Sequence, residues 1–487
     1  MVEKPEKAGS AAPALVWFRD DLRLADHPAL AEAVKTGRPV ICLYVLDETP
    51  ALRPLGAAAR WWLAGSLRAL SAALAKHDAA LVLRRGPAIE SVAKLAKESG
   101  ATTVHWNRRY GPGATVDAAL EQKLERQGVS VATFQANVLH EPPVPGKGGK
   151  PLMVFTPFWR TAQARGAPRA PMPAPRRIQG VKGVASDDLA GWRLEPTAPD
   201  WAAEMRGTWV RGEAGAQQRL GEFLDGELTG YATRRDRPDL PGTSRLSPHL
   251  RFGEVSPFQV WHSTQLAADV ATHVATHVAT HGGRAQRPRA ADAEKFLSEI
   301  GWREFCYQSL HLNPDFHIRN LDRRFDRFPW RKDRKALRAW QKGMTGYPIV
   351  DAGMRQLWRT GWMHNRVRMV VASFLVKHLL IDWREGEAWF WDTLVDADPA
   401  NNPASWQWVA GCGADAAPYF RVFNPAIQAE KFDPDGDYVR AFVPEARDAG
   451  GLFGRSYPAP MVDHQAARER ALEAFATIKS SPAGRTD

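Results

Sequence analysis

One pattern near the start of the chain limits the folds that it can adopt. Between residues 14 and 136, short apolar runs alternate with longer segments of helical periodicity, which is typical of a parallel α/β sheet. A helix is expected at 57–76, for example. The expected strands are residues 14–19, 39–47, 80–84, 102–107 and 130–135. Such sheets bind ligands beyond the carboxyl ends of their strands, but no Gly-x-Gly-x-x-Gly follows the first strand, which disfavours a dinucleotide in this domain.

The chain changes character twice after this sheet. Residues 140–199 are rich in Pro, Gly and basic side chains, which indicates a connector wrapped over the surface, with one helix near 156–165. From about Arg211 onward the segments have helical periodicity. We therefore expect a Rossmann-like α/β domain at 13–139, a connector at 140–210 and an all-α domain at 211–480.

Composition narrows the classes of partner. A length of 487 residues allows two or three domains with a substantial core. The chain has 65 Lys and Arg against 54 Asp and Glu, and the net charge of +11 fits a polyanionic partner, although it can also serve solubility. It has 19 Trp but only 8 Tyr. Tryptophan stacks well on bases and planar cofactors, while its ordinary role is core packing.

Cysteine usage and the lengths of apolar runs indicate the cellular compartment in which the protein is expected. Cys42, Cys306 and Cys412 lie far apart and have no metal-ligand spacing, so we expect no disulfide framework and a reducing cytoplasm. Residues 1–12 contain no apolar stretch of signal-peptide length. No run of 18 apolar residues occurs, which argues against a membrane span.

A Val-Ala-Thr-His repeat occupies residues 270–281. In a helix it would place His273, His277 and His281 on one face, as metal ligands could be. Because Gly282 follows and the composition is repetitive, an expanded helix end or loop is the preferred interpretation, and we predict no metal site.

The segment from 346 to 431 combines polar groups with tryptophans to an unusual degree. Its apolar residues at 367, 370, 371, 374 and 375 have the spacing of one helical face, which predicts a helix packed into a large core. Arg366 and Arg368 lie off that stripe. Taken alone, the segment could be an ordinary amphipathic helix with solvated arginines.

Several long motifs, in order, resemble the photolyase/cryptochrome family. They run from Val-Trp-Phe-Arg-Asp-Asp-Leu-Arg-Leu at 16–24, through Gly-Trp-Met-His-Asn-Arg-Val-Arg-Met at 361–369, to Tyr-Phe-Arg-Val-Phe-Asn-Pro at 419–425. The resemblance is to bacterial members that repair cyclobutane pyrimidine dimers. It implies an antenna domain, a helical FAD domain and a light-dependent DNA lyase. In that reaction excited reduced FAD donates an electron to the dimer and takes it back after the ring opens.

Two segments resemble the family's diphosphate-binding motifs, namely residues 231–236 and 242–247. A diphosphate needs converging hydroxyl and backbone N–H groups, although a Ser/Thr helix cap is an alternative reason for these residues. Asp396-x-Asp398 could suggest a metal, but an arginine partner is more economical. The residues that the resemblance assigns to FAD are Tyr231, Thr243, Ser244, Arg245, Leu246, Ser247, Phe296, Glu299, Arg368, Asp396, Ala397, Asp398 and Asn402.

Other residues resemble the lesion pocket and the photoreduction chain. A flipped-out dimer needs flat apolar walls and a few polar contacts. The residues assigned to DNA are Arg235, Trp302, Arg303, Asn365, Arg366, Met369, Trp408 and Gln428. The resemblance places Asn402 opposite flavin N5, gives Glu299 a lesion contact, and matches Trp406, Trp383 and Trp330 to the chain that carries electrons to oxidised flavin; these five residues are the candidate catalytic set.

The family's antenna chromophore is often methenyltetrahydrofolate, which is the first expectation here. Folate-binding relatives carry an Asn-Glu pair where this chain has residues 110–115, and a Cys and a Lys where it has His317 and Ile318. A differently filled or empty site is therefore the alternative. We expect a monomer that acts on DNA containing pyrimidine dimers and has no obligate protein partner.

Three other functions are alternatives to dimer repair. A cryptochrome-type photoreceptor shares the fold and the flavin. Repair of the (6-4) photoproduct usually involves a pair of histidines, where this chain has His364-Asn365. A non-enzymatic DNA-binding module is the third, and it would be separated by its flavin content.

Overall fold

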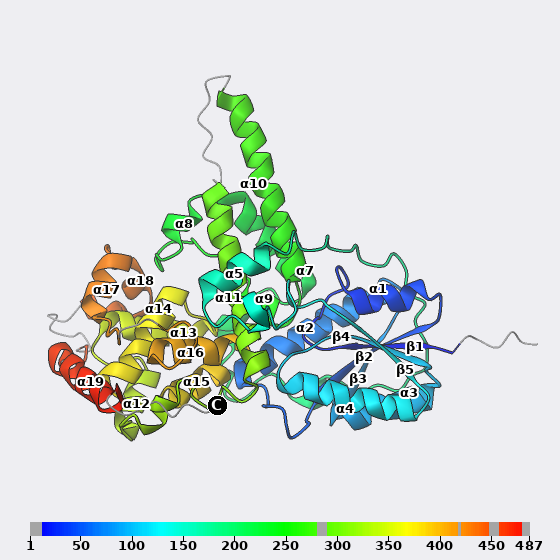
Figure 1. The fold of residues 1–487 in the computed structure, drawn as a ribbon, viewed down its shortest axis with the longest axis horizontal. Helices are drawn as coiled ribbons and strands as arrows, with labels where there is room; N and C mark the ends of the chain where they lie inside the picture. The colour runs from blue at the N-terminus through cyan, green and yellow to red at the C-terminus, as the bar shows by residue number, and fades with distance from the viewer. Residues whose placement is uncertain (1–11, 280–289, 417–419, 448–456, 480–487) are drawn as a thin grey trace, which may run out of the picture.

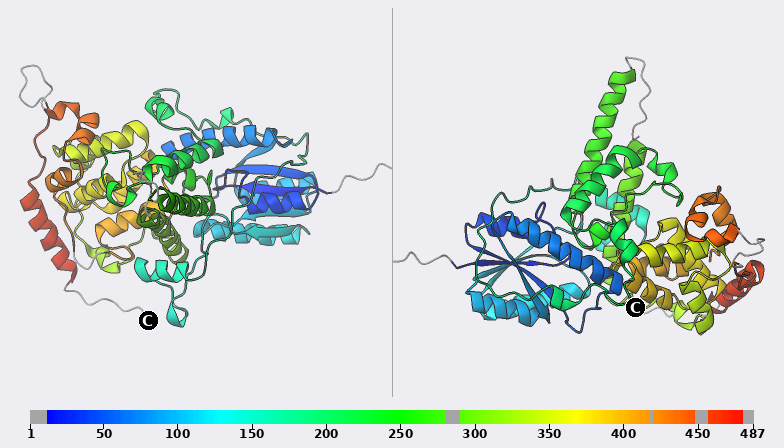
Figure 2. Two further views of the ribbon diagram at one scale, coloured as in Figure 1. Left: turned by 90° about the horizontal axis from the view of Figure 1, so that it is seen from above. Right: turned by 180° about the vertical axis from the view of Figure 1, so that it is seen from behind.

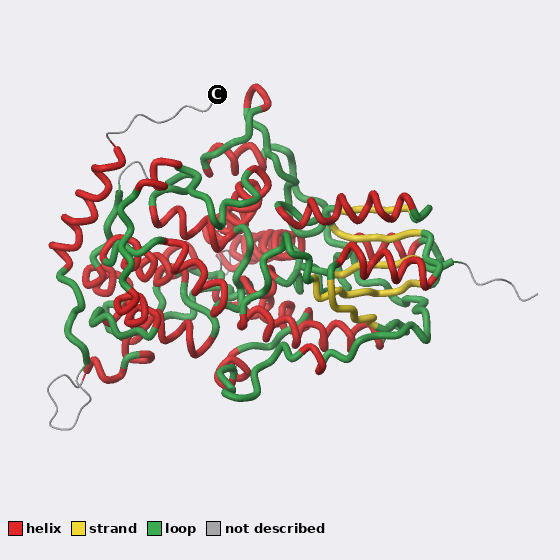
Figure 3. Tube along the Cα trace, turned by 90° about the horizontal axis from the view of Figure 1, so that it is seen from below, coloured by secondary structure: helices red, strands yellow, loops and turns green. Residues whose placement is uncertain are grey.

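The protein has an α/β part and a helical part that lie side by side (Figure 1). The computed structural model describes residues 12–279, 290–416, 420–447 and 457–479, with 271–279 described by backbone alone. All the strands gather at one end of the molecule (Figure 3). The predicted fold class, a parallel sheet followed by a helical region, is therefore confirmed.

The N-terminal part is built on a five-stranded parallel sheet in the order β3-β2-β1-β4-β5. Each strand lies within two residues of its predicted bounds. The strands are β1 Ala14–Phe18, β2 Val40–Asp47, β3 Leu81–Gly86, β4 Thr103–Asn107 and β5 Ser130–Phe134.

Successive side chains of each strand point to opposite faces of the sheet, so the core of the α/β part consists of two clusters. Val16 and Phe18 face a cluster that includes α1 Pro28–Lys35 and α2 Ala57–Ala75. Trp17 faces the opposite cluster, which includes α3 Ala88–Ser99 and α4 Pro112–Arg126. Helices therefore cover both faces of the sheet, as a parallel sheet requires (Figure 2).

The carboxyl edge of the sheet is filled by buried charges. Arg19 follows β1 and donates to both oxygens of Asp117 at 2.8 Å, and Arg109 donates to the same carboxylate at 2.6 Å. Asn107 donates to Asp21 at 2.8 Å. Burial alone would raise the pKa of both aspartates, but His27 and Arg19 beside Asp21, and the two arginines beside Asp117, outweigh it and hold both pKa values below the usual range.

The connector returns to the sheet. Its helix, α5 Phe155–Gln163, confirms the predicted segment, and the short helices η1 Lys147–Gly149, η2 Ala190–Trp192 and α6 Ala203–Thr208 lie on either side. Val40 donates to Gln179 O at 2.8 Å, and Val181 donates to Val40 O at 3.2 Å. The expectation of an irregular surface segment therefore missed that backbone pairing ties this segment to β2.

The rest of the described chain is helical. Its elements are α7 Glu213–Glu222, η3 Phe223–Glu227, α8 Tyr231–Arg234, α9 Ser247–Arg251, α10 Pro257–Ala279, α11 Ala290–Leu312, η4 Arg323–Arg327, α12 Arg334–Gln341, α13 Pro348–Thr360, α14 Asn365–Ser373, η5 Phe374–His378, α15 Trp383–Thr393, α16 Asn401–Ala410, α17 Pro425–Phe432, α18 Asp437–Phe442, η6 Pro444–Arg447 and α19 His464–Lys479. The predicted apolar stripe is buried along α14 and η5, which form one core with α13, α15 and α16.

Close approach of α15 and α16 depends on a glycine. A Cβ at Gly386 would lie 2.1 Å from Cη2 of Trp406, so a larger residue would have to displace the Trp406 ring of α16. α16 also carries Asn402, and this contact therefore helps to set the position of a predicted site residue.

A loop of the α/β part docks on α15. Trp391 donates through Nε1 to Pro54 O at 2.8 Å, and Ala57 N donates to Asp392 at 2.9 Å. A Cβ at Gly56 would lie 2.0 Å from Trp391 O, so the loop approaches the helix as closely as backbone allows. We call residues 51–57 the docking loop.

The histidine repeat lies at the end of a helix that projects from the body of the protein (Figure 1). α10 continues to Ala279, which agrees with an expanded helix end. The side chains of His273 and His277, and all of His281, lie outside the described residues.

No helix among the described residues is both long enough and apolar enough to cross a membrane.

Candidate functional site

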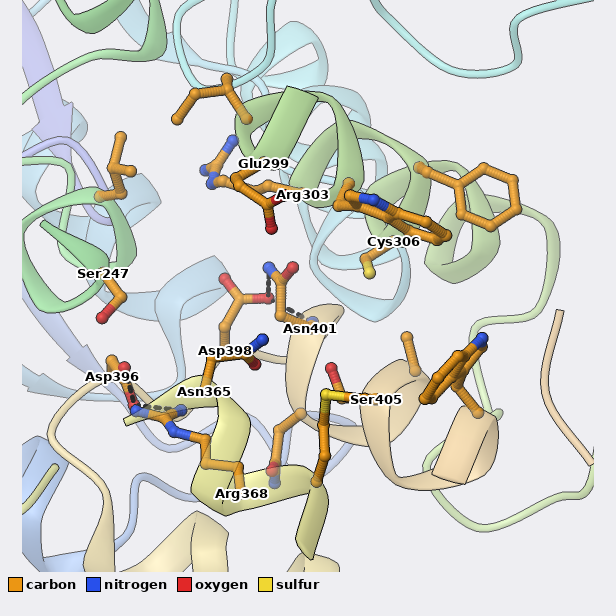
Figure 4. A pocket seen from close by; sticks show the side chains of 18 of the residues that line it. Ser247, Glu299, Arg303, Cys306, Asn365, Arg368, Asp396, Asp398, Asn401 and Ser405 are labelled. Carbon is orange, nitrogen blue, oxygen red and sulfur yellow. Dashed lines mark hydrogen bonds and ion pairs between the residues drawn. The ribbon is translucent and has the colours of Figure 1, made fainter. Parts of the chain in front are cut away.

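Most of the predicted site residues surround one cavity in the helical part. It has a volume of about 610 Å³ and is lined from α8, α9, α11, α14, α16 and the segment before α16 (Figure 4). The assigned residues that line it are Tyr231, Arg235, Ser244, Ser247, Phe296, Glu299, Trp302, Arg303, Asn365, Arg366, Arg368, Met369, Asp396, Ala397, Asp398, Asn402, Trp406 and Trp408.

Arg368 and Asp396 form an ion pair in the cavity wall. The arginine donates to the two carboxylate oxygens at 3.1 and 2.8 Å, and its Nε donates to Met363 O at 2.7 Å (Figure 4). The aspartate side chain is 2% exposed. The predicted arginine partner of Asp396 is therefore present, and a two-point contact of this kind holds the guanidinium in one orientation.

Asp398 organises the start of α16. Its Oδ1 accepts hydrogen bonds from the backbone N–H groups of Ala400 and Asn401, each at 2.8 Å. Its Oδ2 accepts one from the Tyr307 hydroxyl at 2.9 Å. The carboxylate therefore fixes the helix that presents Asn402, and sequence reasoning missed Tyr307 as its partner.

The segment 243–247 is only partly in the cavity. Ser244 and Ser247 line it, whereas Leu246 is buried and Arg245 packs its guanidinium 5.0 Å from the Trp362 ring. Thr243 does not line the cavity either. Leu246 is the residue before α9, so no Ser or Thr side chain caps this helix and the helix-cap alternative is not supported.

Glu299 lies between two cations. Arg235 donates to its Oε1, and Lys295 Nζ lies 3.2 Å from the same oxygen. Both cations also line the cavity. The structure thus places Arg235, assigned to DNA from the sequence, against the carboxylate assigned to the lesion.

Trp302 is covered on one face by the connector. The Phe155 ring of α5 is stacked on it at a centroid distance of 3.7 Å and an interplanar angle of 8°. Trp408 lies elsewhere on the cavity wall and donates through Nε1 to Asp415 O at 3.1 Å. Phe155 was not found from the sequence, because nothing near it in the chain marks it as a partner of α11.

Arg303 points into the interior instead of the surface. Its residue is 8% exposed, and Nη1 donates to Asn137 O at 2.6 Å. Next to it, Glu304 accepts from His140 N at 3.0 Å, and burial raises the pKa of this carboxyl to about 7. The structure thus places Arg303, assigned to DNA from the sequence, in the cavity wall.

A basic cleft adjoins the cavity. Arg366 donates to Asp236 at 2.7 Å, and both residues line the cavity and the cleft. The cleft is also lined by Arg421, Gln428, Lys431, His464 and Arg468. Gln428 is thus outside the cavity but beside Arg366, and neither Arg366 nor Arg368 is the freely solvated arginine of an ordinary amphipathic helix.

The three tryptophans of the expected relay lie at different depths. Trp406 lines the cavity and is 2% exposed, and Trp383 is fully buried with its Nε1 donating to Asn320 at 2.8 Å. Trp330 is partly buried and packs 4.3 Å from the Phe328 ring. Trp406 thus lies at the cavity, Trp383 in the core and Trp330 partly at the surface.

Two family descriptions match this chain. Residues 14–176 match the family described as DNA photolyase, and residues 296–477 match the FAD binding domain of DNA photolyase. The chain therefore belongs to the DNA photolyase family, and its helical part carries the FAD-binding domain of that family.

Individual relatives agree with this assignment. Deoxyribodipyrimidine photo-lyase of Agrobacterium fabrum (strain C58) is 50% identical over 492 residues, which cover 96% of this chain and 99% of the relative. Cryptochrome-1 of Arabidopsis thaliana is 36% identical and covers 96% of this chain, with 71% of its own length matched. The crystal structure of a bacterial class III photolyase from Agrobacterium tumefaciens superposes with a TM-score of 0.91, at 49% identity, over 98% of this chain and 100% of that one. The family and the enzyme class predicted from the sequence are confirmed.

Proposed function

We propose that this protein uses light and FAD to split cyclobutane pyrimidine dimers in DNA. The observation that carries the proposal is a cavity of about 610 Å³ that joins the Arg368–Asp396 ion pair to tryptophan walls and borders a basic cleft. One space can thus receive both a cofactor and a base taken out of the DNA stack.

The cavity wall suits FAD. A volume of this size lies within the usual range of ligand sites. Ser244 and Ser247 offer hydroxyl groups, Phe296 an apolar surface and Arg368 a fixed cation. Bound reduced FAD supplies the electron that a dimer accepts when light excites the cofactor. The chain's own residues hold the cofactor, exclude water and place the dimer; none is needed as a nucleophile.

The tryptophan wall suits a flipped-out lesion. A damaged base pair is weakened, so turning it out of the helix costs a few kcal/mol or less. Trp302 is held flat by Phe155 and can replace the stacking that the dimer loses, while Glu299, Asn365 and Met369 line the same cavity. Arg366 and Gln428 in the cleft would contact the strand near the lesion.

The (6-4) alternative finds less support. His364 is 3% exposed, and its Nδ1 accepts a hydrogen bond from Arg366 N at 3.2 Å at the start of α14. Burial lowers the pKa of this imidazole to about 4, so it is neutral near pH 7. A histidine committed to a helix cap in this way is poorly placed to transfer a proton to a lesion.

Flavin content and repair together test the proposal. Correctly folded protein should release about one equivalent of FAD on denaturation and, after chemical reduction and illumination, convert dimers in DNA to monomers. Less than a tenth of an equivalent of FAD would contradict the proposal. Protein that binds FAD but converts no dimers would instead be a photoreceptor, and conversion of (6-4) photoproducts alone would mean the other repair reaction.

One cavity-lining tryptophan, one core tryptophan and one that is partly exposed support a photoreduction relay. We propose that Trp406, Trp383 and Trp330 pass electrons to oxidised flavin. Trp383→Phe keeps an apolar ring in the core but is much harder to oxidise. The variant should bind FAD and damaged DNA like the parent, lose light-driven flavin reduction, and repair dimers once reduced chemically. If the variant reduced its flavin in light as well as the parent does, the relay would be refuted.

Methenyltetrahydrofolate as antenna, a monomeric state and a cytoplasmic location stay predictions. All three cysteines are free and buried, as expected for a protein without a disulfide framework. The absorption spectrum of purified protein, taken before and after release of bound chromophores, checks the antenna.

A further inference from the structure

The carboxamide of Asn402 is held by Glu387 of the neighbouring helix. Its Nδ2 donates to the Glu387 backbone oxygen at 3.1 Å and to the side-chain Oε1 at 2.8 Å. Asn402 lines the cavity and is 7% exposed, and Glu387 is a buried residue of α15.

These two contacts determine which end of the amide faces the cavity. Both partners are oxygen atoms that accept hydrogen bonds, so the NH₂ group of Asn402 must point at them. With both N–H bonds used, the amide presents its Oδ1 to the opposite side. Oδ1 accepts no hydrogen bond from any residue that the structure describes, and the cavity is the space beside it.

Glu387 is in turn held from the α/β part. Arg53 of the docking loop donates to its two carboxylate oxygens at 2.6 and 2.8 Å, although the two residues are 334 positions apart. The carboxylate is 2% exposed and the guanidinium 26%, and Arg53 also lies 4.2 Å from the Trp391 ring. A two-point ion pair of this kind removes the rotational freedom of the carboxylate.

We propose that Glu387, oriented by Arg53, is a positioning residue that keeps the carbonyl oxygen of Asn402 turned toward the cavity, so that the site favours flavin with a hydrogen on N5. This proposal rests on the proposed function, which puts FAD in the cavity, and on the family resemblance, which sets Asn402 opposite flavin N5. A carbonyl oxygen accepts a hydrogen bond from N5–H, but it repels the lone pair of an N5 without hydrogen.

Removing the hold should let the amide rotate. In Glu387→Leu the side-chain acceptor is gone and only the longer contact to the backbone oxygen of residue 387 still orients the amide, so Asn402 should present its NH₂ end to the flavin more often. The equilibrium constant for reducing bound FAD to forms with N5–H should fall about tenfold, the size expected of one net hydrogen bond. Glu387→Gln keeps an acceptor oxygen at similar reach and should retain most of the parental value.

The measurement is the reduction equilibrium of FAD bound to the full-length protein, followed by absorption against reference dyes in the absence of DNA. Asn402→Leu should cause a similar fall, and adding Glu387→Leu to it should change the equilibrium no further, because the glutamate acts through the amide. Asp392→Asn is the matched control, since Asp392 also joins α15 to the docking loop but does not contact Asn402.

A second variant separates a loss of protein stability from a loss of the orientation of Asn402. If Glu387→Leu folds poorly because Arg53 is left without its partner, Arg53→Met combined with Glu387→Leu removes both charges, and it should show the same tenfold fall. An unchanged equilibrium in this variant, an equal effect of Gln and Leu, or a full effect of Glu387→Leu in the Asn402→Leu background would overturn the proposal.

The outcome is distinguishable from failure of the proposed function. Protein that shows the shift but repairs no dimers would refute dimer repair and leave the positioning role standing. Protein that repairs dimers but shows no shift would refute the positioning role alone. Protein that binds no FAD would overturn both.

Discussion

Arginines and aspartates pair in two regions of this protein, in different surroundings. At the carboxyl edge of the sheet, Arg19 and Arg109 converge on Asp117. In the helical part, Arg368 and the buried Asp396 pair within the wall of a cavity of about 610 Å³. The same kind of ion pair thus supports a sheet edge in one region and lines an open cavity in the other.

The two regions also differ in the direction in which they shift the pKa of a buried carboxyl group. At the sheet edge, cations outweigh burial and lower the pKa of Asp21 and Asp117. Beside the cavity, burial prevails at Glu304 and raises its pKa to about 7, even though Arg303 lies 3.5 Å away. Lowering the pH should therefore reduce the stability of the sheet edge and increase the contribution of Glu304 to stability.

The largest expected effect is at the sheet edge. Asp117→Asn leaves two buried guanidinium groups without their shared anion, which should lower the free energy of unfolding by about 3–5 kcal/mol. Urea unfolding checks this, with Glu90→Gln in the exposed Lys123 pair as a control that should change stability by less than about 1 kcal/mol. FAD content per folded molecule should stay parental; loss of FAD at full stability would show that this edge contributes to the flavin site.

Glu304 should make the free energy of unfolding fall as the pH rises, opposite to the usual effect of a buried, paired carboxylate. Its folded pKa of about 7 exceeds the value of about 4.3 in an unfolded chain, so its stabilising contribution is complete below pH 4.3 and is lost as the pH rises toward 7. Relative to Glu304→Gln, the parent should lose up to about 3 kcal/mol of unfolding free energy across this window. Urea titrations at several pH values measure it. A parent and variant whose curves run parallel would mean that Glu304 stays ionised.

A smaller effect is expected at the cavity wall. Trp302→Ala removes the stacking surface, so the preference for damaged over undamaged DNA should fall by about 1–3 kcal/mol, while affinity for undamaged DNA changes little. Competition binding measures both. Trp358→Ala, an exposed tryptophan outside the cavity, is the control. An undiminished preference in Trp302→Ala would remove this residue from the lesion site.

The smallest effect is expected in the basic cleft. Arg366→Gln should weaken damaged and undamaged DNA alike, by about 1 kcal/mol, and reduce the slope of log affinity against log salt by about 1. Binding at several salt concentrations checks this. Arg319→Gln, which removes an exposed arginine outside both the cavity and the cleft, corrects for the change in net charge. A loss confined to damaged DNA would place Arg366 at the lesion instead of the strand.

Local patterns in the sequence were sufficient to predict the strands, helix α14 and the pair of charged residues in the cavity wall. Short apolar runs located the strands within two residues, because β1 and most of β2 are buried on both faces. The helical stripe around Val370 located α14 for a similar reason. Motif order then brought Arg368 and Asp396 into one site, where the structure finds them paired.

Contacts between distant segments escaped prediction. Phe155 looks like one apolar residue in a proline-rich connector, and only the fold shows that it covers Trp302. Arg53 and Glu387 each look like ordinary surface charges in sequence, since their pairing depends on how the two parts dock. The contact of Arg303 with Asn137 O was not predicted either, because motif position reveals which residue is present but not which way its side chain turns.

The docking loop has a consequence for how this protein can be recombined with its relatives. A chimera that takes its α/β part from another family member would also import a different loop against α15. Unless that loop supplied an arginine for Glu387, a backbone acceptor for Trp391 and a glycine at position 56, the graft would misfit at the helix that holds Asn402. The two parts are therefore not interchangeable modules, and a change of antenna by wholesale exchange would have to carry seven loop residues of the original chain with it, 51–57.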